Sequence, residues 1–255
     1  MNEPVVAAFL NAIFYKNQLE LNAKPIKFNQ LSGIEYIQKL QHPWPRSFSY
    51  NLEFFAGEIS PVIVDQEIHI YLGEKSQEFV LNVFSHNLSF LIPGYRDIGY
   101  LHAWNNTLML HKLKAKNRGK DNNEKVEIFP IENSQNVALV NTIEPDYPAS
   151  TLSLSDTNIL SLYATYEGKI GAKAQAVAID EQYLYIADMF THPAFRRKGL
   201  SSALMHTLHQ WGVERGCRYA ILVPSRMTRD IELFQRFFYK DEIPFALFIP
   251  AAINS

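Results

Sequence analysis

One stretch in the C-terminal half combines basic, glycine and small hydroxyl residues in a pattern suited to binding an anion. It reads Arg196-Arg197-Lys198-Gly199-Leu200-Ser201-Ser202, between a strand-like run over 183–190 and an amphipathic run to about residue 215. A helix start presents backbone N–H groups without intrahelical partners at the positive end of the helix dipole. Gly199 lets an anion approach the backbone closely. The pattern therefore predicts a phosphate-binding strand–loop–helix junction, against the alternative of a solvated basic helix end.

This segment resembles the acyl-CoA-binding motif of the GNAT superfamily of N-acetyltransferases, written Arg/Gln-x-x-Gly-x-Gly/Ala. Here the motif runs from Arg196 to Ser201, so a serine replaces the usual last glycine or alanine. Upstream, the family usually shows Val-x-Pro, and the matching triplet is Thr191-His192-Pro193. The resemblance extends from about Val126 to the C-terminus.

The elements that must position this loop can be read from hydrophobic periodicity. We expect strands over 126–131, 160–166, 172–179, 183–190, 219–223 and 245–249, with helices over 134–143, 200–215 and 228–238. This order is also the order of elements in the GNAT fold. The resemblance therefore implies an α+β fold of the α/β three-layer type, with a GNAT-like mixed sheet flanked by helices in the C-terminal half.

The N-terminal half predicts a further α+β domain. Spacing favours helices from Asn2-Glu3-Pro4 onward and over 30–40, and alternation favours strands over 53–63, 67–72 and 89–92. A turn is expected at Pro93-Gly94 and a buried run over 101–113. The segment 78–84 is compatible with either a helix or a strand. No copy of the CoA motif occurs here. We expect this half to be a degenerate second GNAT-like copy or to shape the acceptor cleft.

The run Lys112–Lys125 is the one compositional break, with six basic residues, a glycine and paired asparagines. A linker is favoured over a nucleic-acid arm because aromatic residues are not interleaved with the charges. We therefore place the domains at 1–115 and 126–255. The net charge of −2 over 255 residues gives no global reason to expect a nucleic-acid partner.

Cysteine content and hydropathy indicate the compartment. Cys217 is the single cysteine, which rules out an internal disulfide and fits a reducing environment. No apolar run reaches the roughly 18 residues of a membrane span, and no signal peptide opens the chain. We expect a cytoplasmic protein with no membrane partner. His206 and His209 lie three apart without a third ligand, so a polar helix face is favoured over a metal site.

The family resemblance implies acetyl-CoA as co-substrate. By this resemblance the diphosphate is bound by backbone amides and basic side chains of Arg196, Arg197, Lys198, Gly199, Leu200, Ser201 and Ser202. Met189, Phe190 and Thr191 are expected to contact pantetheine through their backbones, because the family's equivalent strand splays from the next one, here 219–223. One N–H near Thr191 would polarise the thioester carbonyl.

The catalytic residues follow less directly from the resemblance. Phe234 occupies the position of the family's usual tyrosine, Val223 that of an occasional glutamate, and Tyr239 lies about 140° around a continued helix. Tyr185 and Asp188 are therefore the candidate catalytic residues. The alternative for Tyr185 is a packed aromatic residue, and the alternative for Asp188 is a structural carboxylate. His192 and Ser225 are further candidates. Without a bulge, strand alternation places Tyr185 on the face of Met189 and Asp188 on the other.

The function implied is transfer of an acetyl group from acetyl-CoA to a primary amine, by direct attack in a ternary complex. The sequence does not identify the acceptor, which is a small molecule or a protein N-terminus or lysine. It also leaves the oligomeric state open, with a homodimer as one option. A catalytically silent acyl-CoA sensor or scaffold is the alternative, because Phe234, Val223 and Ser201 depart from the family pattern. A third reading is an unrelated α+β protein with a chance phosphate loop.

Overall fold

The computed structural model describes residues 3–21, 24–27, 34–38, 52–73, 78–114, 123–145, 147–224 and 231–251. The chain forms two compact units. The first contains residues 1–10, 21–109 and 223–255, and the second contains 11–20 and 110–222. The C-terminal segment therefore belongs to the same unit as most of the N-terminal half. The predicted domains 1–115 and 126–255 stay a prediction.

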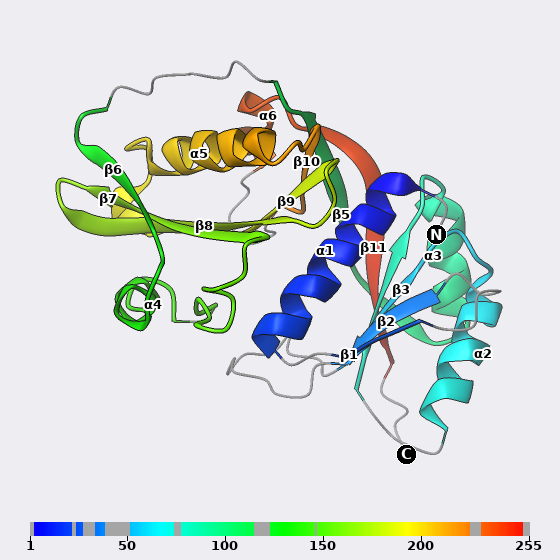
Figure 1. Ribbon diagram of the computed structural model, residues 1–255. Coiled ribbons are helices and arrows are strands. Elements are labelled where there is room, and N and C mark those ends of the chain that lie inside the picture. Colours follow the sequence, from blue (N-terminus) through cyan, green and yellow to red (C-terminus); the bar gives the residue numbers. More distant parts are fainter. Residues whose placement is uncertain are drawn as a thin grey trace. The chain divides into compact units, whose positions relative to one another are not determined.

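The second unit is built on a five-stranded sheet with the order β10-β9-β8-β7-β6 (Figure 1). Its strands are β6 (Val126–Pro130), β7 (Ile159–Tyr166), β8 (Lys169–Ala178), β9 (Tyr183–Thr191) and β10 (Tyr219–Leu222). Neighbouring strands from β6 to β9 are antiparallel, whereas β10 runs parallel to β9. The parallel pair requires a crossover connection, which the chain between residues 191 and 219 supplies.

Helix α5 (Leu200–Glu214) forms this crossover and packs on β7, β8 and β9. Its close approach to the sheet depends on Gly212, where a Cβ atom would lie 2.7 Å from Leu184 Cδ2. Helix α4 (Ser134–Asn141) begins with an Asn133 side chain that caps Asn136 N. Figure 1 shows α5 and α4 on opposite sides of β7 and β8. Residues 11–20 of helix α1 (Pro4–Leu21) complete the unit.

The first unit has a sheet with the order β1-β2-β3-β4-β11, followed by β5. These strands are β1 (Lys24–Lys27), β2 (Ile34–Gln38), β3 (Leu52–Ala56), β4 (Val80–Phe84), β5 (Tyr100–Lys112) and β11 (Lys240–Pro250). The last residues of β5 belong to the second unit. The helices are α2 (Pro61–Leu72), α3 (Leu88–Asp97) and the short α6 (Ile231–Arg236).

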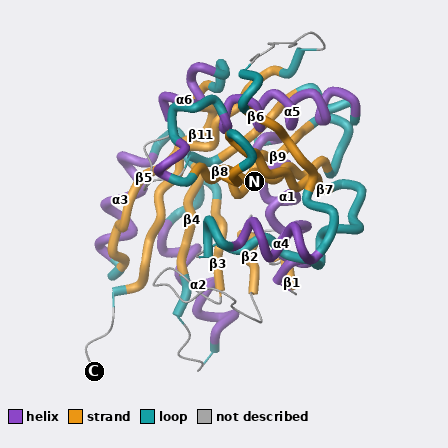
Figure 2. Tube along the Cα trace, turned by 90° about the vertical axis from the view of Figure 1, so that its left-hand side faces the viewer, coloured by secondary structure: helices purple, strands orange, loops and turns teal. Residues whose placement is uncertain are grey.

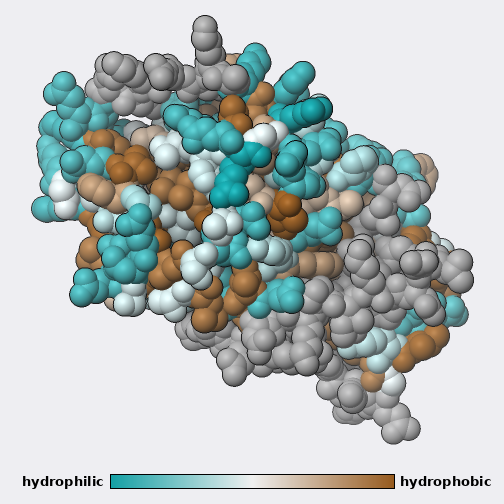
Figure 3. All heavy atoms as spheres, in the orientation of Figure 1, coloured by the Kyte–Doolittle hydropathy of each residue, from teal (hydrophilic) through white to brown (hydrophobic). Residues whose placement is uncertain are grey.

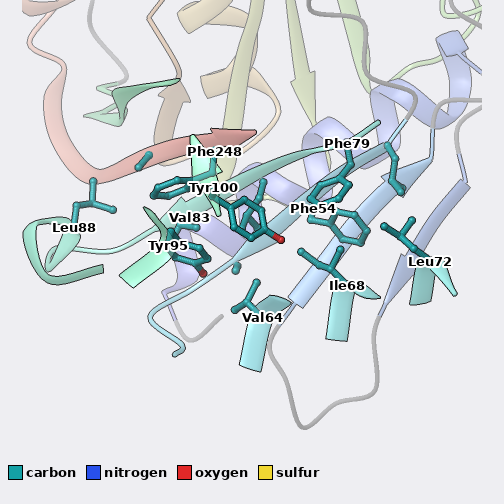
Figure 4. Close-up of a cluster of buried hydrophobic side chains, with 14 residues drawn as sticks. Phe54, Val64, Ile68, Leu72, Phe79, Val83, Leu88, Tyr95, Tyr100 and Phe248 are labelled. Atoms are coloured by element: carbon teal, nitrogen blue, oxygen red, sulfur yellow. The ribbon is translucent and has the colours of Figure 1, made fainter. Parts of the chain in front are cut away.

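An aromatic core fills the first unit (Figure 4). Tyr95 stacks on Phe248 with 4.5 Å between ring centroids, and Phe54 meets Phe79 edge to face at 5.2 Å. Helix α2 contributes Val64, Ile68 and Leu72, one buried stripe at spacings of four residues. This stripe explains why the predicted strand over 67–72 is wrong: the alternation of 68, 70 and 72 coincides with a helical stripe, and Ile70 is 77% exposed.

Other N-terminal predictions also fail. The helix expected over 30–40 contains strand β2, and its remaining residues lie outside the described part of the chain. The strand over 53–63 ends at Ala56 and gives way to α2 at Pro61. Residues 89–92 and the expected turn at Pro93-Gly94 both lie within α3. In the C-terminal half, by contrast, every expected strand and helix over described residues is present.

The two units share one succession of elements, visible in Figures 1 and 2. In the first, an antiparallel meander β1-β2-β3 is followed by α2, β4 parallel to β3, α3 and β5. In the second, the meander β7-β8-β9 is followed by α5, β10 parallel to β9, α6 and β11. The last strand of the second series, β11, pairs with β4 of the first unit. The mixed sheets flanked by helices confirm the expected fold class.

At the surface of the second unit, Figure 3 shows apolar side chains among hydrophilic ones over β6 and β7. Phe129 on β6 is 36% exposed, and its ring stacks on that of Tyr163. None of the helices that the structure describes is long and apolar enough to cross a membrane.

Candidate active site

The predicted phosphate loop lies between the end of β9 and the start of α5. A single 3-10 turn, η1 (Pro193–Phe195), leads from the strand into the loop. Arg197 and Gly199 both adopt left-handed backbone conformations, with φ of 60° and 90°. The Thr191 and Ser201 hydroxyls lie 2.7 Å apart and form a hydrogen bond. Two of the positions that depart from the family pattern, Thr191 in the upstream triplet and Ser201 in the loop, are thus bonded to each other.

The start of α5 offers uncapped backbone donors. Gly199 is the N-cap residue and has no side chain to accept a hydrogen bond from the first helical turn. The nearest atom to a Cβ built at Gly199 is Asn123 Nδ2, at 3.8 Å. This side chain donates to the carbonyl oxygen of Lys198 at 3.0 Å. Open space at an uncapped helix N-terminus fits a diphosphate group.

The three basic side chains of the loop lie in different surroundings. Arg196 and Arg197 are exposed. Lys198 is half-buried, with its Nζ atom 4.5 Å from the ring centroid of Tyr166 and 5.1 Å from that of Phe195. Cation–π attraction therefore holds the Lys198 ammonium group against the sheet. Arg196 Nε donates a hydrogen bond to the Thr191 carbonyl oxygen at 3.4 Å, and both arginine side chains are accessible to an anion in solvent.

Strand β9 extends beyond its parallel neighbour. The ladder between β10 and β9 ends with the pair Ile221 and Tyr185, whereas β9 continues to Thr191. Met189, Phe190 and Thr191 all lie in this continuation. Their backbone groups on that edge are beyond the ladder with β10, as the family resemblance implied. Binding of pantetheine at this edge stays a prediction.

A bulge interrupts β9 within the same continuation. Gln175 pairs with Ala187 and Lys173 pairs with Phe190, so two residues of β9 stand opposite one of β8. Asp188 is one of the two and has a φ of 49°. The extra residue reverses the alternation of faces beyond it.

The bulge changes which candidate side chains share a face. Tyr185 pairs with Val177, and Phe190 pairs with Lys173. Val177 and Lys173 are four residues apart on β8, so their side chains lie on one face of the sheet, and those of Tyr185 and Phe190 lie on the same face. Met189, next to Phe190, lies on the other face. Asp188 reaches the face of Gln175 and Tyr185. The expectation that Tyr185 lies with Met189, opposite Asp188, is therefore wrong because it required an unbroken strand.

An ion pair with α1 holds Asp188. Its Oδ2 atom lies 2.9 Å from Lys16 Nζ, which also contacts Glu20 Oε2 at 2.8 Å. The Lys16 side chain is 8% exposed, and the Asp188 side chain 31%. Burial favours the neutral carboxyl, but attraction by Lys16, its hydrogen bond and the charge of Lys173 outweigh burial and lower the pKa of Asp188. Burial likewise disfavours charge on Lys16, but Asp188 and Glu20 raise its pKa.

These groups form what we call the bulge charge cluster: Lys16, Glu20, Lys173 and Asp188. Glu20 accepts hydrogen bonds from Gln175 Nε2 and Ser153 Oγ, both at 2.8 Å. Lys173 is 3% exposed and donates to the carbonyl of Tyr147, and burial lowers its pKa despite the nearby carboxylates. Sequence reasoning missed Lys16 and Glu20. Their only signal is a lysine and a glutamate four residues apart, the two charged residues of a largely apolar helix.

The remaining candidates lie elsewhere. Val223, Phe234 and Tyr239 belong to the first unit, and Ser225 lies outside the described residues. Phe234 and Tyr239 are 5% and 2% exposed, and burial raises the pKa of the Tyr239 hydroxyl. His192 caps η1 by accepting a hydrogen bond from Ala194 N. Its ring therefore has a local structural partner.

The histidines of α5 do not form the expected polar face. His209 is 3% exposed and its ring stacks on that of His111. Burial, followed by the neighbouring His111 and His206, lowers the pKa of His209 to about 3. Among the described residues, no group of three or more histidines, cysteines or carboxylates could hold a metal ion.

Comparison with known proteins agrees with this geometry. The family described as "Acetyltransferase (GNAT) family" matches residues 126–238. This segment, which contains the β9–α5 junction, is therefore similar to the acetyltransferases of that family. Proteins of this family use acetyl-CoA as the acyl donor. A search of curated proteins found no match.

Solved structures similar to the chain extend the likeness over both units. A GCN5-related N-acetyltransferase from Kribbella flavida has 14% identity and a TM-score of 0.68, covering 96% of this chain and 94% of its own. A GCN5-related N-acetyltransferase-like protein from Streptococcus suis has 12% identity and a TM-score of 0.56, with coverages of 98% and 93%. A tandem GNAT protein from the clavulanic acid biosynthesis pathway has 6% identity and a TM-score of 0.58, with coverages of 91% and 84%. At these identities the likeness concerns the fold.

Proposed function

We propose that the protein is an N-acetyltransferase that moves an acetyl group from acetyl-CoA to a primary amine of a small molecule or protein. The observation that carries this proposal is the junction of β9 and α5. There an uncapped helix N-terminus opens at Gly199, two exposed arginines flank it, and the backbone edge of β9 extends past β10. These are the three features that a diphosphate and a pantetheine arm require.

The cofactor site uses two groups of residues. The diphosphate is bound by the backbone amides after Gly199, by the arginines and by the positive end of the helix dipole. The pantetheine amides pair with the free edge of β9. The residues proposed are Met189, Phe190, Thr191, Arg196, Arg197, Lys198, Gly199, Leu200, Ser201 and Ser202. Lys198 contributes charge from its position above the Tyr166 ring.

Asp188 is the group we propose to meet the acceptor amine. It lies beside the pantetheine segment, and its lowered pKa keeps it ionised at neutral pH. Its carboxylate accepts a hydrogen bond from the amine N–H and takes up the proton as nitrogen bonds to the acetyl carbon. The C–S bond breaks with its electron pair on sulfur, and the thiolate takes a proton from water. Tyr185, on the same face, orders the amine or an intervening water.

We propose that the N-terminal half is a degenerate second GNAT-like copy without a CoA site. It repeats the order of elements of the second unit, and a tandem GNAT protein shares the fold of the chain. The loop from β3 to α2 carries Glu58 where the other copy carries arginines. Glu58 accepts hydrogen bonds from Ser85 and Asn87. A carboxylate at this position repels a diphosphate, so this half is left to shape the acceptor cleft.

A catalytically silent acyl-CoA sensor is the second candidate. Phe234, at the position of the family's usual tyrosine, is buried and has no proton to give. The sensor and the enzyme share the cofactor site and differ only in turnover.

Calorimetry with CoA, and thiol release from acetyl-CoA with a panel of amines and peptides, test the proposal. Gly199→Asp sets a carboxylate at the diphosphate site and should weaken CoA binding at least tenfold. Gly199 has a φ of 90°, so an aspartate is strained at this position, and the control variant has to carry the same strain. Gly216→Asp is the matched control, at φ 84° just past the other end of α5, and should keep CoA affinity.

Equal CoA affinity in wild type and Gly199→Asp, or no CoA binding by wild type, would refute the proposed site. Tight CoA binding without thiol release on any amine would favour the sensor.

A further inference from the structure

The starting observation is the conformation of Asp188. A positive φ is uncommon for a residue other than glycine, and it persists where the surroundings hold it. The surroundings here are the antiparallel partner β8 on one edge and the ammonium group of Lys16 at the carboxylate. Lys16 lies on α1, outside the segment 126–238 that matches the family.

We propose that Lys16 is a positioning residue for acyl transfer, whose ammonium group holds the Asp188 carboxylate at the bulge of β9. This inference rests on the proposed function. Lys16 bridges Asp188 and Glu20 at 2.9 and 2.8 Å, and its side chain is almost fully buried. Glu20 is in turn fixed by Gln175 and Ser153. The Lys16 ammonium group is therefore held by Glu20 and contacts Asp188 with the same nitrogen atom.

The charged groups around Asp188 come from three segments. Lys16 and Glu20 lie on α1 and Lys173 on β8, and Glu144, just after α4, acts on Lys173. Lys173 cannot take the place of Lys16, because it donates to the Tyr147 carbonyl and burial disfavours its charge. Without Lys16, Asp188 would face the carboxylate of Glu20 without the cation between them. Its charged form would then be destabilised.

Two consequences follow for the reaction. A carboxylate that stays ionised and fixed can accept the amine N–H, whereas a protonated or displaced one cannot. The acid limb of the pH profile of kcat/KM is therefore set by the ion pair of Lys16 and Asp188, and helix α1 supplies the Lys16 partner. The GNAT segment alone would carry an Asp188 without its principal cation.

The direct test is the carboxyl-carbon NMR titration of Asp188, assigned by the resonance that Asp188→Asn removes. In Lys16→Met, the titration midpoint should rise by about one pH unit or more, since a neighbouring opposite charge is lost. In Lys16→Arg, which keeps the charge, it should stay near the wild-type value. Lys125→Met removes an ion pair with Glu167 in which both side chains are 57% exposed, and it should leave the midpoint unchanged.

The same variants should change activity in parallel. Lys16→Met should shift the acid limb of kcat/KM to higher pH and lower kcat/KM about tenfold at pH values on that limb, while CoA affinity stays within about twofold, because Lys16 is outside the cofactor loop. Lys16→Arg should restore most of the activity. An unmoved Asp188 titration in Lys16→Met, or an equal change in Lys16→Arg, would overturn the inference.

The outcomes separate this inference from the proposed function. Absence of CoA binding in the wild type overturns the acetyltransferase assignment and with it any role of the pair in transfer. Normal CoA binding with an unmoved titration overturns the role of Lys16 alone. If Lys16→Met fails to fold, Glu20→Gln is the second variant. It removes the competing carboxylate, so Lys16 pairs with Asp188 alone and the titration midpoint of Asp188 should fall. A rise in this midpoint would count against the inference.

Discussion

Acid should weaken the second unit through His209, a buried neutral imidazole on helix α5. Its pKa is about 3 in the folded protein, whereas histidine titrates near 6.5 when unfolded. Between these values the unfolded chain binds a proton that the folded chain does not, so the free energy of unfolding falls as pH decreases. The loss is about 2 kcal/mol at pH 5 and approaches about 5 kcal/mol near pH 3.

The measurement is urea unfolding from pH 7.5 to pH 4.5 on wild type and His209→Leu. The variant loses the titrating group, so its stability should fall less steeply, with the difference growing by about 1.4 kcal/mol per pH unit below 6.5. Thr207→Ala, on the same helix and without a titrating group, is the control and should keep the wild-type slope. Identical slopes in wild type and His209→Leu would refute the assignment of a buried neutral imidazole.

Three further predictions concern the site. Gly171→Ala places a Cβ 2.6 Å from the Phe195 ring and should cost about 1–3 kcal/mol in chemical denaturation, with weaker CoA binding; wild-type stability would show that the loop yields without strain. Thr191→Val alone should lower the free energy of unfolding by about 1 kcal/mol, because it leaves the Ser201 hydroxyl without its hydrogen-bond partner. The double variant with Ser201→Ala should recover most of that loss. Additive losses would argue against the hydrogen bond. Tyr239→Phe should leave thiol release within about twofold, since the hydroxyl is buried in the first unit; a tenfold loss would restore Tyr239 as an acid.

The C-terminal half could be predicted because its signals are local. The stretch from Arg196 to Ser202 contains the glycine and the charges of the loop, and the leucines of α5 repeat at helical spacing. In the meander β7-β8-β9, the residues of each connecting turn themselves indicate where the strand ends. Such patterns need no knowledge of distant contacts.

The failures have a different physical origin. In α2, apolar residues at 68, 70 and 72 satisfy both periods, and only the partner sheet decides which side chains are buried. The bulge at Asp188 is one extra residue whose presence depends on the register with β8. Lys16 reaches Asp188 across 172 positions of the sequence, a pairing that no local pattern encodes.

The pairing of β11 with β4 also bears on biosynthesis. Residues 245–248 pair with β4 of the first unit, so this sheet cannot close until residue 248 has left the ribosome. Until then β4 exposes an unsatisfied edge, which is where chaperones or aggregation would act. Removal of β11 therefore leaves β4 without this antiparallel partner.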